Sequence, residues 1–285
     1  MLPSSSELHY FLEIAATLNM SRAAERIGIS QPALTLAVQR LEESFGQPVL
    51  LRSKTGVRLT RAGERLAIHA RLLISEWEKI RTDASKDEEE IGGRYSIGCH
   101  PSVALYTLPH FLPSLMRDNP RLDINIVHNL SRKITEDVIS FKVDFGIVVN
   151  PVPHPELIIK PLFNDEVCLW VGSGKVNKSV LIYEPDLIQS QDLLRQMAKK
   201  KLVFNRTITS SNLEVISSLV AVGTGVGILP TNVAKKFREF NLKPFESQFS
   251  FEDRVCMIFR ADVQKSKASR YLAQKITTAL GSVHG

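Results

Sequence analysis

Apolar and polar positions in the first fifty residues recur with a helical period, in three short blocks. Over Glu7–Leu18 the apolar residues return every three or four positions, which predicts an amphipathic helix. A second helix is expected over Arg22–Ile27 with Ser21 as its cap, and a third follows the cap Ser30. Gly28 suits a tight turn between the second helix and the third.

Two short helices joined by a glycine turn match the helix-turn-helix arrangement, in which the second helix enters the major groove of DNA. Polar residues open that second helix here, and glutamine and threonine are side chains that read base edges or thymine methyl groups. A purely structural three-helix bundle is the alternative. The candidate DNA contacts are Ser30, Gln31, Pro32 and Thr35, with Arg22 and Arg40 for phosphates or bases.

Two short strand-like segments follow, Val49–Leu51 and Val57–Leu59, around a basic stretch that contains a glycine. A basic hairpin directly after a recognition helix is expected to act as a wing that contacts phosphate or the minor groove. Arg52 and Lys54 are its candidate contacts. The alternative is a solvated turn whose cations have no function.

A long amphipathic helix is predicted from Arg61 to about Asp87. At 1.5 Å per residue it is about 40 Å long, too long to be packed inside so small a domain, so we expect it to pair with its copy in a second chain. An acidic run and Gly92-Gly93 end this helix. We therefore expect a winged helix-turn-helix domain at 1–60, a linker helix for dimerisation at 61–91 and a further domain at 92–285.

Beyond Gly93, apolar runs alternate with amphipathic segments, which is typical of βαβ units and an α/β fold. The final helix is expected near 267–280. The expected strands are 95–99, 122–127, 145–149, 167–171, 180–183, 202–204, 226–229 and 255–259, with helices at 105–118, 131–141, 188–198 and 211–222. This order fits two α/β lobes joined by crossing strands.

Composition adds little to the nucleic-acid hypothesis. The net charge is +6, but residues 1–91 hold 12 Lys and Arg against 13 Asp and Glu, and the remainder holds 24 against 17. The basic excess therefore lies outside the expected DNA-binding part. No signal peptide or membrane-spanning run is apparent, which predicts a cytoplasmic protein without a membrane partner.

Several motifs together resemble the N-terminal signature of LysR-type transcriptional regulators. They are Ser21-Arg22-Ala23-Ala24-Glu25-Arg26, Ile29-Ser30-Gln31-Pro32-Ala33-Leu34-Thr35, Leu41-Glu42 and Leu59-Thr60-Arg61-Ala62-Gly63-Glu64. Asp144-Phe145-Gly146-Ile147 and the stretch 221–230 resemble landmarks of the family's effector domain, so the resemblance covers essentially the whole chain. One departure is Leu36-Ala37, where many members carry polar or basic side chains.

The resemblance implies a regulator that binds promoter DNA and a small effector. It also implies a C-terminal domain like the periplasmic solute-binding fold, a homodimer formed through the linker helix, a homotetrameric assembly and RNA polymerase as a candidate partner. Ligands in such folds lie between the lobes, at the carboxyl ends of strands and at helix N-termini. The expected effector contacts are Ser102, Val103, Asn129, Ser131, Tyr183, Glu184 and Asn205.

Ser102 and Ser131 are the first candidates, as hydroxyl donors, although simple helix caps would look the same in sequence. Glu184 is a departure, since a carboxylate in the mouth of the site would repel an anion or else select a cation or a polyol. His128 and Arg206 are close enough in sequence to offset that charge.

No catalytic motif, metal-ligand spacing or cofactor motif stands out, so we expect no enzyme, metal or cofactor. The glycine-rich run 223–227 lies between a helix and a strand, the reverse of the order that binds dinucleotides, and is interpreted as a tight turn. Cys99, Cys168 and Cys256 are interpreted as buried thiols, with a redox switch as the alternative. A cytosolic small-molecule-binding protein without specific DNA readout is the alternative function.

Overall fold

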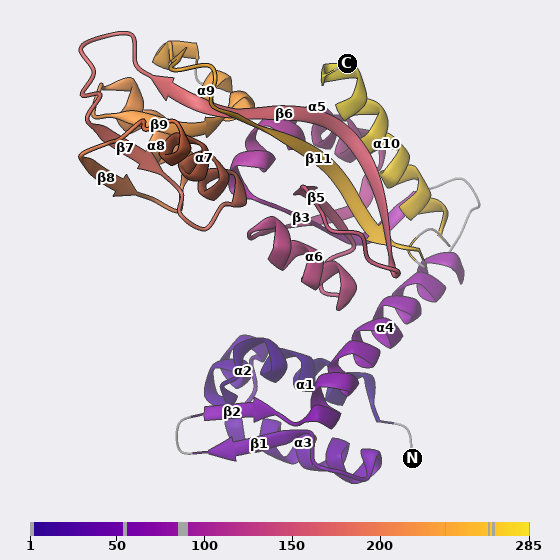
Figure 1. Ribbon diagram of the computed structural model, residues 1–285. Helices are drawn as coiled ribbons and strands as arrows, with labels where there is room; N and C mark the ends of the chain where they lie inside the picture. The colour runs from indigo at the N-terminus through magenta and orange to yellow at the C-terminus, as the bar shows by residue number, and fades with distance from the viewer. Residues whose placement is uncertain are drawn as a thin grey trace. The chain divides into compact units, whose positions relative to one another are not determined.

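The computed structural model describes residues 3–53, 56–84, 91–236, 238–261, 263 and 266–284. Contacts divide the chain into two compact units. One comprises residues 1–89 with 140–142, and the other comprises residues 90–139 with 143–285 (Figure 1).

Three helices open the N-terminal unit: α1 (Ser5–Thr17), α2 (Met20–Ile27) and α3 (Gln31–Phe45). The Ser30 side chain caps α3, as predicted, and accepts a hydrogen bond from the backbone N–H of Ala33. The prediction that Ser21 caps α2 is wrong. Asn19 is the cap, and its side chain accepts the backbone N–H of Arg22 at 3.0 Å.

The helices enclose a small core in which Phe11, Ile14, Leu34 and Leu41 are fully buried. Within each helix these apolar positions stand three or seven apart, so each helix turns one stripe toward the centre. Gly28 adopts φ +77°, a backbone conformation that favours glycine, and this allows α2 to turn into α3. The helical periodicity of the sequence therefore gave the correct three helices.

Strands β1 (Leu50–Ser53) and β2 (Gly56–Leu59) form the antiparallel hairpin that was expected as a wing. The long helix α4 (Arg61–Ala84) follows at once, and the Thr60 hydroxyl caps it by accepting the backbone N–H of Gly63 at 2.9 Å. The same hydroxyl donates to the Pro48 carbonyl at 2.9 Å. Thr60 thereby joins the start of α4 to the start of the hairpin. The predicted end of this helix near residue 87 lies outside the described residues.

The C-terminal unit is built on one mixed sheet with the strand order β4-β3-β5-β11-β6-β9-β7-β8. Parallel strands make up each end of this sheet. In the first lobe they are β3 (Gly92–Cys99), β4 (Arg121–His128) and β5 (Phe145–Val149), and in the second lobe β7 (Val180–Tyr183), β8 (Arg206–Thr209) and β9 (Val226–Pro230).

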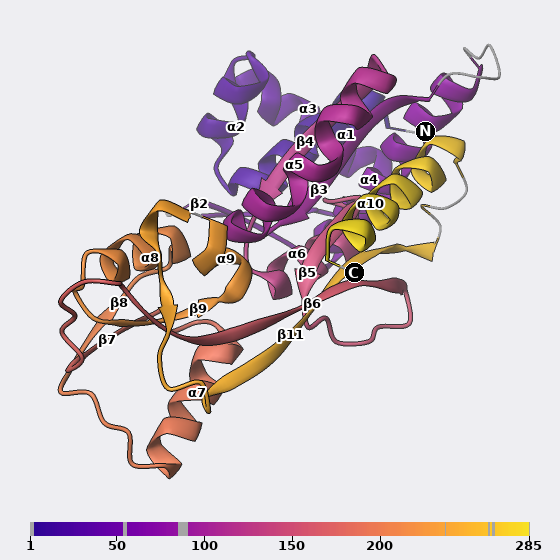
Figure 2. The same cartoon turned by 90° about the horizontal axis from the view of Figure 1, so that it is seen from above.

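Two long antiparallel strands, β6 (Leu157–Val171) and β11 (Ser250–Arg260), connect the lobes and run side by side through the unit (Figures 1 and 2). Strand β5 pairs with β11 and β9 pairs with β6, so the two lobes share one sheet. The expected strands 167–171 and 255–259 are only parts of these crossing strands. The polar residues Asn164, Asp165 and Glu166 interrupt the apolar pattern of β6, which hid its length.

Helices cover both faces of the sheet. The first lobe carries α5 (Pro101–Asp118) and α6 (Ser131–Ile139), the second carries α7 (Ile188–Lys199), α8 (Leu213–Ala221) and α9 (Thr231–Lys236), and α10 (Lys267–His284) closes the chain. Ile258 on β11 packs in the cluster under α6, whereas its neighbours Met257 and Phe259 join the cluster shared with α5 and α10. Successive side chains of a strand point to opposite faces, so α6 lies on the opposite face.

One predicted strand is wrong. Residues 202–204 form no strand, because the backbone N–H of Leu202 donates to the Met197 carbonyl and continues the end of α7. Leu202 and Phe204 pack against the second-lobe core instead. The real strand is β8, whose sequence Arg206-Thr207-Ile208-Thr209 is mostly polar because it forms the exposed edge of the sheet. The short strand β10 (Lys243–Pro244), the 3-10 helix η1 (Arg238–Phe240) and α9 were not predicted.

Candidate nucleic-acid interface and effector site

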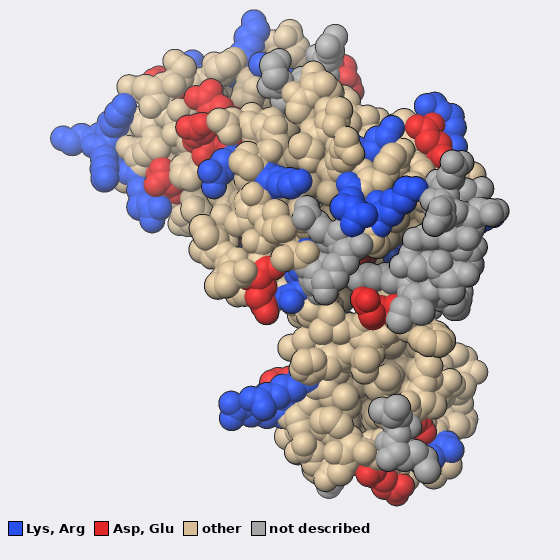
Figure 3. Space-filling view, turned by 90° about the vertical axis from the view of Figure 1, so that its right-hand side faces the viewer, with Lys and Arg blue, Asp and Glu red and all other residues tan. Residues whose placement is uncertain are grey.

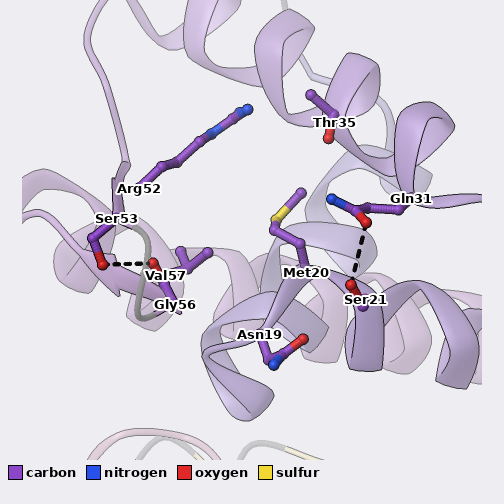
Figure 4. A pocket seen from close by; sticks show the side chains of 9 residues that line it. All are labelled: Asn19, Met20, Ser21, Gln31, Thr35, Arg52, Ser53, Gly56 and Val57. Atoms are coloured by element: carbon purple, nitrogen blue, oxygen red, sulfur yellow. Dashed lines mark hydrogen bonds between the residues drawn. The ribbon is translucent and has the colours of Figure 1, made fainter.

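The N-terminal unit contains a groove of about 460 Å³ between the helix-turn-helix and the wing (Figure 4). Gln31 and Thr35 line it from α3, and Arg52 lines it from β1. Figure 4 shows the Arg52 side chain extending from the wing toward the α3 side of this opening. The other lining residues are Asn19, Met20, Ser21, Ser53, Gly56 and Val57.

Ser21, which was not among the predicted site residues, holds the Gln31 side chain in place. The Ser21 hydroxyl donates to Gln31 Oε1 at 3.2 Å, so α2 orients the amide at the start of α3. The Nε2 atom of Gln31 carries two N–H donors that can bond to an acceptor on a bound molecule. Sequence spacing alone could not reveal this pair, because the two residues come together only when the glycine turn folds α3 back against α2.

The first turn of α3 presents Ser30, Gln31 and Pro32 at the surface, and Thr35 is half-buried. Leu36 is also exposed, whereas Ala37 is 4% exposed and belongs to the core. The departure noted at Leu36-Ala37 therefore concerns only Leu36. A polar side chain at position 37 would be buried rather than directed at DNA.

The candidate basic contacts are not all equivalent. Arg52 lines the groove, and Lys54 lies outside the described residues. Arg22 is exposed on α2 but does not line the groove. The Arg40 Nε atom is 3.8 Å from Glu7 Oε1, so this arginine is directed toward α1. Arg58 on β2 is exposed and lies opposite Leu51 on β1. Its exposure could have been predicted, because side chains alternate along a strand and the neighbouring Val57 is apolar and buried.

The face of the N-terminal unit seen in Figure 3 is mostly free of charged side chains, with few basic groups projecting from it. This agrees with the near balance of charge in residues 1–91. Because basic residues do not outnumber acidic ones in residues 1–91, attraction to phosphate is expected to depend on a few well-placed cations.

In the C-terminal unit, Ser102 is 1% exposed and its Oγ atom has no hydrogen-bond partner among the described residues. It is not the cap of α5. His100 is the cap, and its Nδ1 atom accepts the backbone N–H of Ser102 at 3.3 Å. Val103, the next residue, is buried in the core, so its side chain is part of the packing.

Ser131 and Asn129 have local structural partners. The Ser131 hydroxyl accepts the backbone N–H of Val149 at 3.0 Å and so ties α6 to β5. The Asn129 side chain accepts the backbone N–H of Leu130 at 2.9 Å, while the residue itself is exposed.

The second-lobe candidates lie at two different edges. Glu184 follows the carboxyl end of β7 and is 1% exposed, and its Oε2 atom has no hydrogen-bond partner among the described residues. Tyr183 before it packs partly against the second-lobe core. Asn205 was placed with them because a strand was expected at 202–204. It instead precedes β8, where its backbone N–H donates to Ser179 before β7 begins, so it lies at the opposite, amino edge.

Buried carboxylates gather where the crossing strands pass between the lobes. Asp165 on β6 and Asp253 on β11 are register partners and both are buried. Burial raises the pKa of Asp253 to about 7, hydrogen bonds from Gln189 and Asn150 oppose the rise, and the charge of Asp165 adds to it. Burial also raises the pKa of Asp165. Neither residue of this pair was among the predicted site residues.

Charged groups of the second lobe and of the crossing strands influence the pKa values of two residues near the start of α5, His100 and Tyr106. Burial lowers the pKa of His100, the charge of Glu214 on α8 opposes this effect, and His128 adds to it. Burial likewise raises the pKa of Tyr106 on α5, with Asp165, Asp253 and Glu214 contributing. Groups of the first lobe, the crossing strands and the second lobe therefore share one polar region.

The three cysteines are buried thiols on three different strands: Cys99 on β3, Cys168 on β6 and Cys256 on β11. Burial raises the pKa of Cys99 and of Cys168 to about 12. Within the described parts of the chain, no cluster of three His, Cys, Asp or Glu side chains is arranged to hold a metal ion. None of the described helices is both long and apolar enough to cross a membrane.

Comparison with known proteins agrees with this two-part organisation. A family model for "Bacterial regulatory helix-turn-helix protein, lysR family" matches residues 5–64, and one for "LysR substrate binding domain" matches residues 88–281. The transcriptional regulator BbuR of Bordetella bronchiseptica is 33% identical over 162 residues, which span 57% of this chain and 50% of BbuR.

A probable hydrogen peroxide-inducible genes activator of Streptomyces viridosporus is 30% identical over 244 residues, covering 80% of this chain and 78% of that protein. Among solved structures, a full-length OxyR variant from Pseudomonas aeruginosa superposes with a TM-score of 0.69 at 23% identity, over 98% of this chain and 95% of that chain. The two family models together match most of the sequence, and the chain belongs to the LysR family of bacterial transcriptional regulators.

Proposed function

We propose that this regulator recognises its operator through the groove between α3 and the wing. The observation that supports this most directly is that Gln31 and Thr35 from α3 and Arg52 from the wing line one opening. The N-terminal turn of α3 enters the major groove, and the hairpin follows the adjacent backbone or minor groove. Base contacts then come from the helix, and the phosphate contact comes from the arginine.

Within this arrangement Gln31 is the main reader of sequence. Because Ser21 occupies Gln31 Oε1, the free Nε2 group donates to an acceptor on a base edge, such as purine N7 or guanine O6. Thr35, one helical turn later, contacts a thymine methyl group or a phosphate. Leu36 adds an apolar contact of the same kind, so specificity does not require a charged side chain there.

Selective binding is tested with purified full-length protein, genomic fragments and excess nonspecific DNA at near-physiological salt. One fragment should be retained, and Gln31→Ala with Thr35→Ala should weaken its binding by about 10-fold or more, since a good base contact is worth roughly 1–3 kcal/mol. Gln39→Ala is the matched control, because Gln39 is exposed on α3 and does not line the groove. Equal retention of all fragments would favour the alternative of a small-molecule-binding protein without specific readout.

The active form is proposed to be a dimer through α4, assembled further into a homotetramer. Leu73 and Trp77 on α4 are 62% and 60% exposed, and they stand four residues apart on one face of the helix. A second copy of α4 would cover both side chains. Sedimentation of Leu73→Glu with Trp77→Glu should show dissociation, whereas Arg65→Glu should leave the assembly unchanged.

An effector is proposed to bind between the lobes, near Ser102 and Glu184, and to shift the balance between lobe arrangements that place the wings differently on DNA. This assigns Tyr183, Asn129 and Ser131 to the walls of the site. RNA polymerase remains the candidate partner at the promoter, and the DNA target puts the action of the protein in the cytoplasm. We expect no catalytic turnover from this site.

Peroxide is a second candidate input only because of the name of the Streptomyces relative. Thiol-based sensing requires an accessible cysteine with thiolate character. All three cysteines here are buried, and the pKa of each is raised by burial. The polar region between the lobes favours a reversible small-molecule effector instead.

A further inference from the structure

Apart from Asp137 Oδ1, which forms an ion pair with Lys133 at 3.1 Å, four buried side-chain oxygens in the C-terminal unit have no hydrogen-bond partner among the described residues. They are Ser102 Oγ, Glu184 Oε2, Glu214 Oε1 and Ser217 Oγ. Ser102 and Glu184 are each 1% exposed, and Ser217 is fully buried. Buried polar atoms in folded proteins nearly always have a hydrogen-bond partner, so four without one in a single unit indicate a partner that binds there.

Three of the four come from the carboxyl edge of the second-lobe sheet. Glu184 directly follows β7, and Glu214 lies in the first turn of α8, the helix that follows β8. Strands β7 and β8 are parallel neighbours with Tyr183 opposite Thr209, so both carboxylates stand at the same edge. Ser217 is three residues after Glu214 and therefore shares its side of α8.

The fourth oxygen, Ser102 Oγ, belongs to the first lobe, in the first turn of α5. Ser102 is beside His100, and the charge of Glu214 acts on the pKa of His100 and of Tyr106. Tyr106 also packs edge-on against Phe163 of the crossing strand β6, with ring centroids 6.2 Å apart. Val103 on α5 and Leu213 on α8 also belong to one buried hydrophobic cluster, so the starts of the two helices border the same region.

This region is negative. Glu184, Glu214, Asp165 and Asp253 form no ion pair with any lysine or arginine among the described residues. Burial raises the pKa of Glu184, and the nearby charge of Asp186 raises it further, with no cation lowering it. Arg206, considered above as a counter-charge, is at the amino end of β8 and therefore at the opposite edge.

We propose that the effector of this regulator carries an organic cation, an ammonium or guanidinium group, that donates hydrogen bonds to Glu184 and Glu214 while its polar remainder contacts Ser102 and Ser217. The inference rests on the proposed effector site and adds the chemical class of its ligand. An ammonium has three donors and a guanidinium five, enough to satisfy both orphaned carboxylate oxygens. An anion would meet uncompensated carboxylates. A metal ion fits less well, because the described residues offer no group of three ligands.

The test uses full-length protein and thermal unfolding with methylammonium, 1,4-diaminobutane, agmatine and L-arginine. The neutral control is 1,4-butanediol, and the anionic control is succinate at equal ionic strength. A cationic probe at about 100 times its Kd should raise Tm by roughly 5–10 °C, and both controls should leave Tm unchanged. A rise with succinate, or no rise with any of the four cations at about 10 mM, would overturn the proposal.

Site assignment is tested with Glu184→Gln and Glu214→Gln, singly and together. Each should lower the affinity for the active cation at least 10-fold, and Glu246→Gln, at an exposed carboxylate, should not. An undiminished rise of Tm in the double variant would mean that the cation binds elsewhere, which also overturns the proposal. Circular dichroism checks that each variant folds. If one of the single variants does not fold, the affinity of the other single variant for the cation tests the site assignment.

Measuring operator binding with the same samples distinguishes failure of the proposed ligand class from failure of the proposed DNA-binding function. Selective retention of one fragment together with failure of all the cations would refute the ligand class alone. Loss of selective retention in the unmodified chain would refute the proposed function itself. A cation that both raises Tm and changes the affinity for the operator would support both.

Discussion

Glu42 on the recognition helix accepts a hydrogen bond from the backbone N–H of Val49 at 2.8 Å, where the chain turns into the wing. The same carboxylate oxygen accepts the backbone N–H of Leu50 at 3.1 Å. One side chain of α3 thereby fixes the first residues of the hairpin. The proposed DNA contacts lie on both α3 and the wing. These two hydrogen bonds therefore fix the relative positions that allow α3 and the wing to contact DNA at the same time.

Glu42→Ala is therefore expected to lower the free energy of unfolding by about 2 kcal/mol, because it leaves two partly buried N–H groups without an acceptor. It should also reduce affinity for the operator without abolishing nonspecific binding. Urea denaturation and fluorescence anisotropy measure the two effects. Glu43→Ala is the control, since Glu43 is exposed on the same helix. Equal stability of the two variants would contradict the role assigned to Glu42.

The close packing of α4 against the chain before β1 is tested by Gly63→Ala. Alanine in place of glycine inside an exposed helix ordinarily stabilises by about 0.5–1 kcal/mol. At Gly63, however, an added Cβ atom would collide with the backbone carbonyl oxygen of Val49. We expect Gly63→Ala to lower Tm and to weaken DNA binding because α4 is pushed away from the wing. Ala62→Gly, one position earlier, tests helix propensity alone.

The family motifs were visible in the sequence, but their physical roles were not. Thr60 caps α4 and also donates to the Pro48 carbonyl, and Gly63 allows the close approach of α4 to Val49. The contacts with Pro48 and Val49 join residues more than ten positions apart. Periodicity gave the three helices correctly because each buries one regular stripe. It missed the full length of β6, where polar residues enter the crossing strand at the place where the lobes meet.

The effector site shows the same limit. Ser102 and Glu184 were chosen because they follow strands, and both prove to be buried with unpartnered oxygens. Asn205 was chosen by the same rule from a strand that does not exist, since Leu202 and Phe204 are apolar for packing at the end of α7. Asp165 and Asp253 could not have been paired from the sequence, because 88 positions separate them and only the register of β6 with β11 brings them together.

Arg52→Ala is expected to reduce the salt dependence of DNA binding. A lysine or arginine that neutralises one phosphate contributes about one unit to the slope of log K against log salt concentration. The variant should lose affinity to a similar extent for specific and nonspecific DNA. Gln31→Ala should instead lose affinity for the operator and keep the slope. Titrations at three salt concentrations distinguish these two patterns, and an unchanged slope in Arg52→Ala would mean that Arg52 does not contact phosphate.

Hydrogen peroxide should not switch this regulator through its cysteines. Burial raises the pKa of Cys99 and Cys168 to about 12, so at neutral pH both are protonated and react slowly. Thiol labelling of the native protein should remain low, and operator binding should be the same before and after mild peroxide treatment. Labelling in urea gives the reference for full reactivity. Rapid formation of a disulfide in the native protein would contradict this expectation.

The stability of the C-terminal unit is expected to depend on pH through Asp253, the carboxylate that joins the lobes. Asp253 accepts hydrogen bonds from Asn150 of the first lobe at 2.7 Å and from Gln189 of the second lobe at 2.8 and 2.9 Å. Burial raises its pKa from an ordinary value of 3.8 to about 7, so the folded protein keeps a proton that the unfolded chain releases between these values. The stability contributed by this group is complete below about pH 4 and is lost as the pH rises toward 7.

Asp253→Asn should remove this dependence, because an amide does not ionise and its oxygen can still accept from Asn150 and Gln189. Relative to the parent, the variant should lose less free energy of unfolding between about pH 5 and 7, and it should be the more stable protein near pH 8. Urea denaturation at several pH values measures both differences. Asp192→Asn is the control with the opposite sign, because hydrogen bonds from Gln196 and Arg195 lower the pKa of Asp192. Parallel pH curves for the parent and Asp253→Asn would show that Asp253 has the same pKa in the folded and the unfolded chain, which contradicts this prediction.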